Sequence, residues 1–320
     1  MHKLLAVLLV GVLSGAIQAQ TFPSKPIKIV VPNAAGGAAD MTAREVGQKL
    51  AQALGGSVIV ENKPSAGGIV AGGAVAHSPA DGYTLLLISS GTAVSSALFK
   101  SLPFDAVKDF APISKLASFD LVIASSETGR FKTMAEVLAY ARANPGKLNI
   151  GTPQIGTTQN LAAELFKTSA GIEAQIVPFN GTPPVITALR GGDVDIMVEI
   201  LGPVTGQIKS KALRPLALMG EKRSSLLAGV PTVRESGGSL ATFNATSWNG
   251  LAAPAKTPKD VIAKLNVEIQ KALKNPEVVQ HLAVLSLQTE GSTPEALGEL
   301  LSADTKRWGD VITRAKIAKQ

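Results

Sequence analysis

Short apolar runs alternate with helical patterns from residue 27 onward, and this alternation leaves few possible folds. Ile27–Val31 is rich in β-branched residues, and the next segment, 38–54, places Val46, Leu50 and Leu54 on one helical face. The alternation continues as a strand, a small-residue helix and a strand at 58–60, 67–77 and 83–88. Consecutive strands joined through helices predict a parallel sheet with right-handed crossovers.

A second series of the same kind occupies roughly residues 121–220. Short strands are predicted at 112–116 and 121–124, and Thr133 with Glu136 three residues later indicates a capping box at a helix start. Further strands, with helices between them, are predicted at 148–150, 176–177 and 194–198. The sequence is therefore that of an α/β protein with two parallel units, and 320 residues suffice for two domains.

The C-terminal part has a different pattern. An apolar strand at 250–255 is followed by helices that begin at Thr257 and Thr293, without a further βαβ unit. Helices with an apolar face need a sheet to cover, and the first unit is the natural candidate. We therefore predict a discontinuous first domain and a hinge where the chain crosses twice between domains. The predicted parts are a signal peptide at 1–19, domain 1 at 20–120 and 249–320, and domain 2 at 121–248.

The N-terminus has the pattern of a secretory signal peptide. His2 and Lys3 form a short basic start, Leu4 to Val12 is apolar, and small residues follow up to Ala19. The alternative is a membrane anchor, but the apolar run is short for a bilayer and lacks a charged stop-transfer cluster. We expect export with cleavage after Ala19. The chain has no Cys, so neither a disulfide framework nor a lipid anchor on Cys is expected.

The net charge is +7, and it becomes +6 without residues 1–19, which leaves 30 basic and 24 acidic residues. Lys and Arg are scattered, and aromatic residues make up only 4%, too few for platforms that stack nucleic-acid bases. We therefore expect no nucleic-acid partner. A mildly basic exported protein suits small anions or an acidic partner surface, although an ordinary solvated surface has the same charge.

Residue types suited to catalysis or metal binding are few. His77 and His281 have no companions at the spacing of a triad or a metal site. Asp193 and Asp195 form an i, i+2 pair, which fits either a cation site or a turn residue followed by one that orients a loop. We favour the second interpretation. The sequence thus predicts no catalytic residue, no metal and no cofactor.

Five turns that follow predicted strands share one chemistry. All are small and polar, and only the first is charged: NAAGGAAD (33–40), SAGG (65–68), SSGTAV (89–94), GTPQIGTTQ (151–159) and FNGTPP (179–184). Turns at the carboxyl ends of parallel strands lie together where ligands bind, and helix N-termini attract anions. One such turn reflects only the turn preference of Gly and Ser, but five favour a ligand cleft.

The charge in the first turn, Asp40, has two interpretations. In one it contacts a cationic part of a ligand. In the other it caps local N–H groups or pairs with Arg44 four residues later. We favour the structural pairing.

A series of segments carries a specific resemblance. In order they are FPSKPIKIVVP with GGAAD, VIVENKPSAGG, DGYTLLL, APISKL, NPGKLNIGT, AAELF, IVPFNGTPP, GGDVDIM, GVPTVRESG, SWNGLAAPAKTP and RWGDVI. In this order and spacing the chain resembles the Bug family of periplasmic solute-binding receptors, the extracytoplasmic component of tripartite tricarboxylate transporters. The resemblance covers nearly all of the chain after the predicted signal peptide.

The resemblance implies a type II periplasmic-binding-protein fold, with two α/β domains and a hinged interdomain cleft. It implies a periplasmic, non-enzymatic receptor for a small carboxylate, held through backbone amides and bridging water, with membrane permease subunits as partners. We expect a monomer, with Trp248 near the hinge or cleft. By position, the ligand-binding residues are Asn33, Ala35, Gly36, Gly37, Asp40, Ala66, Gly67, Gly68, Ser90, Gly91, Thr92, Thr152, Gly156, Thr157, Thr158, Phe179, Asn180 and Asp195.

Two departures from the family pattern concern the ligand. The family often has an aromatic residue and prolines where this chain has Asn33-Ala34-Ala35, and often a His where it has Asn160. The expected function is capture of a small carboxylate by domain closure and delivery to a permease. The alternatives are a receptor that serves sensing without transport and an exported enzyme acting on carboxylates, for which no nucleophile–base pair is evident.

Overall fold

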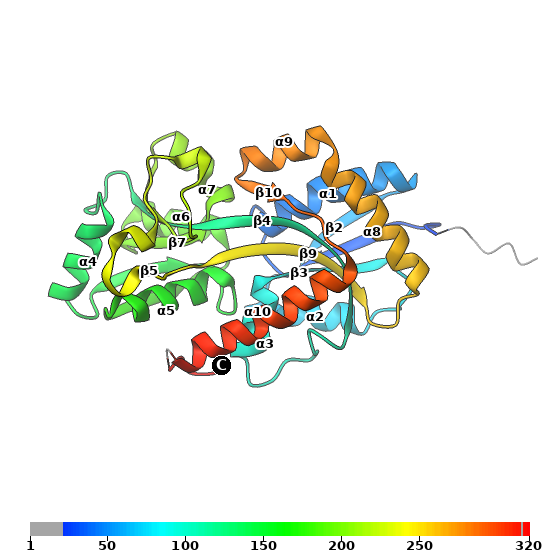
Figure 1. The fold of residues 1–320 in the computed structure, drawn as a ribbon, viewed down its shortest axis with the longest axis horizontal. Helices are drawn as coiled ribbons and strands as arrows, with labels where there is room; N and C mark the ends of the chain where they lie inside the picture. Colours follow the sequence, from blue (N-terminus) through cyan, green and yellow to red (C-terminus); the bar gives the residue numbers. More distant parts are fainter. Residues whose placement is uncertain (1–21, 315) are drawn as a thin grey trace, which may run out of the picture.

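Long antiparallel strands join two parallel β-units in this protein (Figure 1). The computed structural model describes residues 22–314 and 316–320. The predicted signal peptide at 1–19, with its cleavage after Ala19, lies outside these residues. None of the described helices is both long and apolar enough to cross a membrane.

The first parallel unit has the strand order β2-β1-β3. Its strand β1 and helix α1 confirm the predicted bounds residue for residue, and α1 ends at Gly55 in the left-handed conformation that glycine adopts freely. The elements are β1 (Ile27–Val31), α1 (Ala38–Leu54), β2 (Val58–Asn62), a 3₁₀ turn (Ala66–Gly68), α2 (Ile69–Ala76), β3 (Thr84–Ser89) and α3 (Ser90–Leu98).

The second parallel unit has the strand order β6-β5-β7. Its elements are α4 (Met134–Ala143), β5 (Leu148–Thr152), α5 (Thr158–Ala170), β6 (Ala174–Pro178), α6 (Thr182–Gly191), β7 (Ile196–Ile200), α7 (Leu201–Lys209) and β8 (Leu213–Leu218). The elements α7 and β8 were not predicted from the sequence. At the start of α4, Thr133 accepts a hydrogen bond from the Glu136 N–H, but the Glu136 carboxylate bonds to Lys132 N–H, so the predicted capping box is only half formed.

The long strand β4 (Phe110–Ser126) corrects the prediction of two short strands at 112–116 and 121–124. Polar residues interrupt its apolar pattern near the middle, but there the backbone pairs with β9 (Thr246–Pro254). Up to Asp120, β4 pairs with β9, and from Leu121 it pairs with β7 and β8. The change of partner coincides with the predicted domain boundary at 120/121, and the boundaries themselves remain a prediction.

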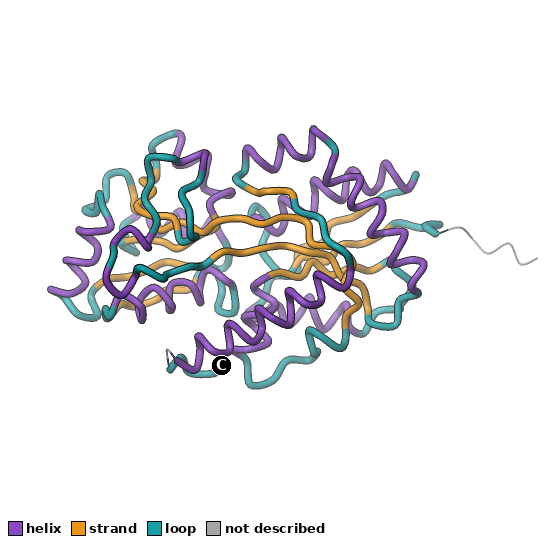
Figure 2. Tube along the Cα trace, in the orientation of Figure 1, coloured by secondary structure: helices purple, strands orange, loops and turns teal. Residues whose placement is uncertain are grey.

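The C-terminal elements return to the first unit, as the sequence predicts. They are α8 (Lys259–Lys274), α9 (Pro276–Val284), β10 (Leu287–Thr289) and α10 (Pro294–Arg314), and they follow three 3₁₀ turns at Ser225–Leu227, Val233–Ser236 and Gly238–Leu240. Ile262, Leu265 and Ile269 of α8 pack into the core that contains Ile27 and Ile29. The helix α10 lies along α3 and β4, and helices flank the strands of both units (Figure 2).

Candidate functional site

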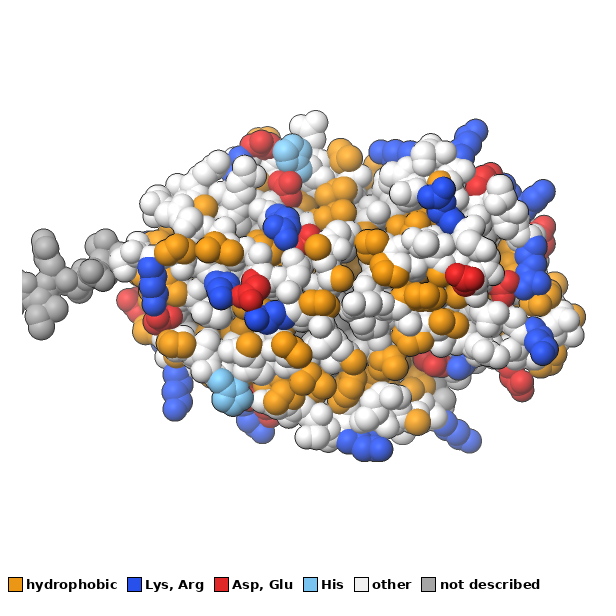
Figure 3. Space-filling view, turned by 180° about the vertical axis from the view of Figure 1, so that it is seen from behind, with side chains coloured by type: hydrophobic (Ala, Val, Ile, Leu, Met, Phe, Trp, Pro, Cys, Tyr) orange, Lys and Arg blue, Asp and Glu red, His pale blue; other side chains and the backbone are white. Residues whose placement is uncertain are grey.

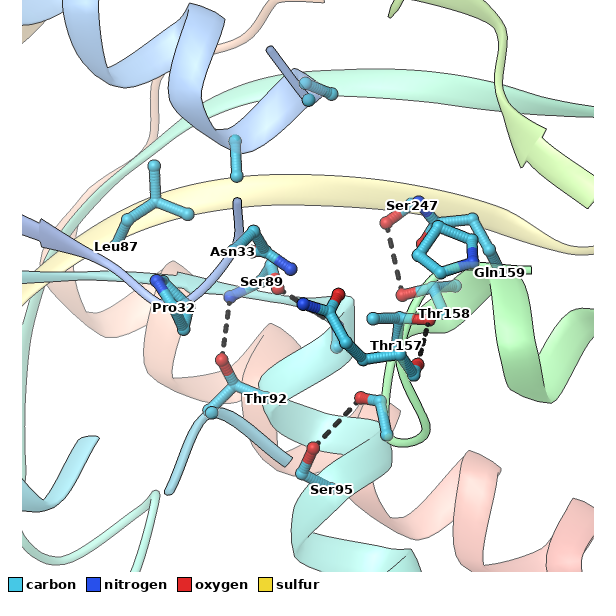
Figure 4. Close-up of a pocket in the computed structure, with 18 of the residues that line it drawn as sticks. Pro32, Asn33, Leu87, Ser89, Thr92, Ser95, Thr157, Thr158, Gln159 and Ser247 are labelled. Atoms are coloured by element: carbon cyan, nitrogen blue, oxygen red, sulfur yellow. Dashed lines mark hydrogen bonds between the residues drawn. The ribbon is translucent and has the colours of Figure 1, made fainter. Parts of the chain in front are cut away.

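A pocket lies between the two units and is lined by residues of both (Figure 4). The turns after β1, β3 and β5 contribute to it, together with residues of the joining strand β9. Nine of the predicted site residues line it: Asn33, Gly37, Gly67, Gly68, Gly91, Thr92, Gly156, Thr157 and Thr158. The structure thus brings together all five of the predicted turns, since Gly181 and Thr182 of the fifth also line the pocket.

Six helices begin at this pocket. The residue that precedes the first turn of each helix is among the lining residues: Gly37 for α1, Gly68 for α2, Ser89 for α3, Thr157 for α5, Gly181 for α6 and Ile200 for α7. The first N–H groups of a helix have no partner within the helix, and the helix dipole is positive at this end. The pocket is therefore suited to an anion.

Charged side chains are absent from the pocket lining that the structure describes. Its polar groups are backbone amides, the hydroxyls of Ser and Thr, and the amides of Asn and Gln. On the face seen in Figure 3, Lys and Arg lie mainly toward the ends and rim, while hydrophobic side chains gather in the middle. An anion would thus be held by dipoles and hydrogen bonds rather than by a Lys or Arg.

The two walls of the pocket contact each other directly. The Gly67 N–H donates to the Ile155 carbonyl at 3.1 Å, and the Ser95 hydroxyl donates to the Gly156 carbonyl at 2.9 Å (Figure 4). Gly156 has φ +84°, and a Cβ on it would lie 2.9 Å from the Gly67 Cα. Glycine at 156 therefore allows both the backbone conformation and the close approach. In this structure the two walls are therefore held in direct contact at Gly67, Ser95 and Gly156.

Asp40 lies in the first turn but outside the pocket lining. Its carboxylate accepts a hydrogen bond from the Gly36 N–H at 3.0 Å and pairs with Arg44 at 2.9 Å. Burial raises the pKa of Asp40, but the bonds from Arg44 and Gly36 outweigh it and hold the pKa below the ordinary value. The structural pairing that the sequence favoured is therefore the one observed.

Asp195 is also outside the pocket. It pairs with Arg130 and accepts a hydrogen bond from the Asn149 N–H at 2.8 Å. It precedes the first residue of β7, whereas the pocket lies at the other end of that strand, at Ile200. Its place at the amino end of the strand separates it from this pocket, and its contacts agree with a role in orienting a loop.

Seven other predicted residues do not line the pocket. They lie in or next to the same turns: Ala35, Gly36, Ala66, Ser90, Thr152, Phe179 and Asn180. Two of them support residues around the pocket. The Ser90 hydroxyl accepts from the Trp248 N–H at 3.1 Å, and the Thr152 hydroxyl accepts from the Asn160 side chain at 3.0 Å. Trp248 lies on β9, close to the junction of the units, as expected.

A further set of polar lining residues was not among the predicted site residues: Ser65, Ser89, Ser95, Gln154, Gln159, Thr182, Ser247 and Asn249. Most lie inside or beside the predicted turns, but Ser247 and Asn249 come from β9, where only the tertiary fold shows the contact. Behind the pocket, Glu199 is completely buried. A carboxyl group in the apolar run IMVEIL was the signal that could have found it.

The two histidines have local contacts. His77 Nδ1 lies 2.8 Å from the Gly73 carbonyl at the end of α2, and His281 lies beside Glu45 on the surface. Within the described residues, no group of three His, Asp or Glu side chains is placed to hold a metal ion.

Two α/β units around a cleft at helix N-termini define the class of periplasmic solute-binding proteins, and the solved structures agree. BugD has a TM-score of 0.89 and 30% identity, covering 93% of this chain and 100% of that one. MatC from Rhodopseudomonas palustris with bound malate has a TM-score of 0.86 and 30% identity, covering 91% of this chain and 100% of that one. An R. palustris protein with adipate has a TM-score of 0.88 and 28% identity, covering 93% of this chain and 99% of that one.

Sequence comparison shows the family of the chain. The model described as Tripartite tricarboxylate transporter family receptor matches residues 42–317, and the chain belongs to this family. BugT of Bordetella pertussis is 32% identical over 325 residues, which cover 99% of both chains. A UPF0065 protein of Pseudomonas sp. (strain P51) is 34% identical over 319 residues, which cover 99% of this chain and 95% of that one. The predicted family and fold class are thus confirmed.

Proposed function

We propose that this protein is an exported, periplasmic receptor that captures a small carboxylate by closure of its two units and delivers it to a tripartite tricarboxylate-type permease. The observation that carries the proposal is the convergence of six helix N-termini on a pocket whose described lining is uncharged. Such a site neutralises an anion with N–H groups from both units, so that binding favours the closed form.

The relatives support a carboxylate as the ligand. Malate and adipate are the compounds named with two solved structures at 30% and 28% identity. An enzyme acting on carboxylates would need a nucleophile with a base beside it. The described pocket lining has hydroxyls but no His, Lys, Asp or Glu to activate one. A monomeric receptor that closes on its ligand, with the domain boundaries predicted above, fits these features better.

The test is a thermal-shift screen of mono-, di- and tricarboxylates, followed by calorimetric titration. At least one acid is expected to raise Tm, because a ligand that binds only the folded state stabilises that state. The uncharged amide of the same acid is expected to leave Tm unchanged. Failure of all the acids contradicts carboxylate capture, and formation of a product contradicts a receptor. Uptake in cells without the permease genes then separates transport from sensing alone.

A further inference from the structure

Glu199 is a buried carboxyl group immediately behind the pocket. It is the fourth residue of β7, 0% exposed, and followed by Ile200, which lines the pocket. Its Oε1 atom accepts two hydrogen bonds, from the Ile200 N–H and from the Gln159 side-chain Nε2, both at 2.7 Å. Gln159 itself lines the pocket. Glu199 thus connects the end of a central strand to a side chain of the pocket wall.

These two bonds determine the orientation of the Gln159 amide. A backbone N–H can only donate, so the Oε1 atom of Glu199 is an acceptor. In the structure Gln159 presents its NH₂ group to this same atom, so its carbonyl oxygen is directed away from Glu199. Among the described residues this carbonyl oxygen has no hydrogen-bond donor. It is therefore available as an acceptor in a pocket whose helix N-termini supply donors.

We propose that Glu199 is a positioning residue that holds the Gln159 carbonyl oxygen toward the ligand, and that this acceptor selects carboxylates bearing a hydroxyl or ammonium group over unsubstituted ones. The inference rests on the proposed function and names its substrate class. A carboxylate oxygen cannot donate a hydrogen bond to the Gln159 carbonyl, whereas a neighbouring O–H or N–H can. A site that presents an unpaired acceptor discriminates against a ligand that lacks the matching donor.

The surroundings of Glu199 favour its protonated form. Burial raises its pKa, and it outweighs the hydrogen bonds from the Gln159 side chain, the Ile200 N–H and the Thr182 side chain, which lower the pKa. The groups that act on its pKa besides burial are neutral. The charged residues on the elements packed against β7 are not among them: Lys115 and Asp120 on β4, Glu164 and Lys167 on α5, Arg190 on α6, and Lys209 on α7.

This protonation pattern identifies the conservative substitution. Because Oε1 accepts twice, a proton on this carboxyl group would lie on Oε2. A Gln at this position reproduces the pattern, with its carbonyl oxygen in place of Oε1 and its NH₂ group in place of the protonated Oε2. Glu199→Gln therefore keeps Gln159 in place, whereas Glu199→Leu removes the acceptor that orients it.

The experiment measures Kd by calorimetry for succinate, malate and aspartate, which differ by one hydroxyl or ammonium group. The wild type is expected to prefer malate or aspartate over succinate on the order of tenfold, the effect of one hydrogen bond in a closed site. In Glu199→Leu and Gln159→Leu the ratio of the succinate Kd to the malate or aspartate Kd falls to about one. An unchanged succinate Kd in these variants shows that the rest of the site is intact. Glu199→Gln keeps the wild-type ratio, as does the control Glu164→Gln, on a carboxyl paired with Lys167.

A preference that survives in Glu199→Leu overturns the inference, as does a wild type that binds carboxylates without regard to the hydroxyl or ammonium group. If Glu199→Leu does not fold, Gln159→Leu decides, because it removes the acceptor directly. If no carboxylate binds the wild type, the proposed function fails and the inference with it. Carboxylate binding without the preference leaves the proposed function standing and overturns the inference alone.

Discussion

The Ser95 hydroxyl on α3 donates to the Gly156 carbonyl before α5, at 2.9 Å, and so joins the two units across the pocket. The backbone bond from the Gly67 N–H to the Ile155 carbonyl lies beside it. Both bonds link segments that are far apart in sequence, and both are made by protein groups alone. Closure is therefore stabilised by direct contacts of the walls, in addition to any contribution from a ligand.

The variant Ser95→Ala tests this contact. Loss of the hydrogen bond leaves the Gly156 carbonyl without this donor and shifts the population toward the open form. We expect a larger radius of gyration by small-angle X-ray scattering without ligand, and a Kd for the best carboxylate raised about 2- to 10-fold. The control is Ser96→Ala, because the Ser96 hydroxyl donates within its own helix, to the Thr92 carbonyl. Equal behaviour of the two variants would contradict the role of Ser95.

The variant Gly156→Ala tests the close approach of the walls. A Cβ there would lie 2.8 Å from the Ser95 Oγ and 2.9 Å from the Gly67 Cα, so closure must be incomplete. We expect a strong loss of affinity in titration calorimetry. The matched control is Gly146→Ala, at φ +72° with no atom within 4 Å of its Cβ. Both variants carry about 1 kcal/mol of backbone strain, so a similar loss of affinity in both would sink the steric explanation.

The variant Trp248→Phe tests the attachment of α10. The buried indole N–H of Trp248 donates to the Asp304 carboxylate at 2.7 Å. Removal of the indole N–H leaves this buried carboxylate oxygen without its donor. The free energy of unfolding in urea titrations should fall by about 1–3 kcal/mol. Trp308→Phe is the control for lost volume, because Trp308 is also buried and its indole N–H has no partner among the described residues. The interpretation fails if Trp308→Phe is as destabilising as Trp248→Phe.

Local patterns predicted much of the fold because each was strong over a whole element. Ile27–Val31 is a β-branched run that ends at Pro32, and 38–54 has a helical period that ends at Gly55, so their bounds were correct. The middle of β4 was missed because Ser118 and Asp120 break its apolar pattern, and only the partner strand β9 supplies the reason for its continuation. Pairing between distant segments decides such cases, and it leaves little trace in one sequence.

The part of the candidate site that lies in the turns could also be predicted from local sequence patterns. Glycine and hydroxyl residues at the ends of strands pointed to the turns that meet at the pocket, because parallel strands end at one edge of a sheet. Asp195 lies outside the pocket because it precedes β7, whereas the pocket is at the other end of that strand. The link between Gln159 and Glu199 spans 40 residues, and no local pattern could predict it.

The last prediction concerns the pH dependence of stability at Glu199. Burial raises the pKa of this group in the folded protein above the ordinary value of 4.5 for Glu. A carboxyl group with a raised pKa binds its proton more tightly when folded than when unfolded, so unfolding releases a proton once the pH exceeds about 4.5. Its stabilising contribution is therefore fully present below that pH and is lost as the pH rises toward the folded pKa.

Glu199→Gln cannot ionise and should not show this loss. Urea unfolding at a series of pH values from 4.5 upward is expected to show Glu199→Gln gaining stability relative to the wild type as the pH rises. Glu164→Gln, at a carboxyl only partly shielded from solvent, controls for the removal of one charge. A constant difference between wild type and Glu199→Gln over this range would show that the Glu199 pKa is not raised on folding. It would also remove the reason for placing a proton on Oε2.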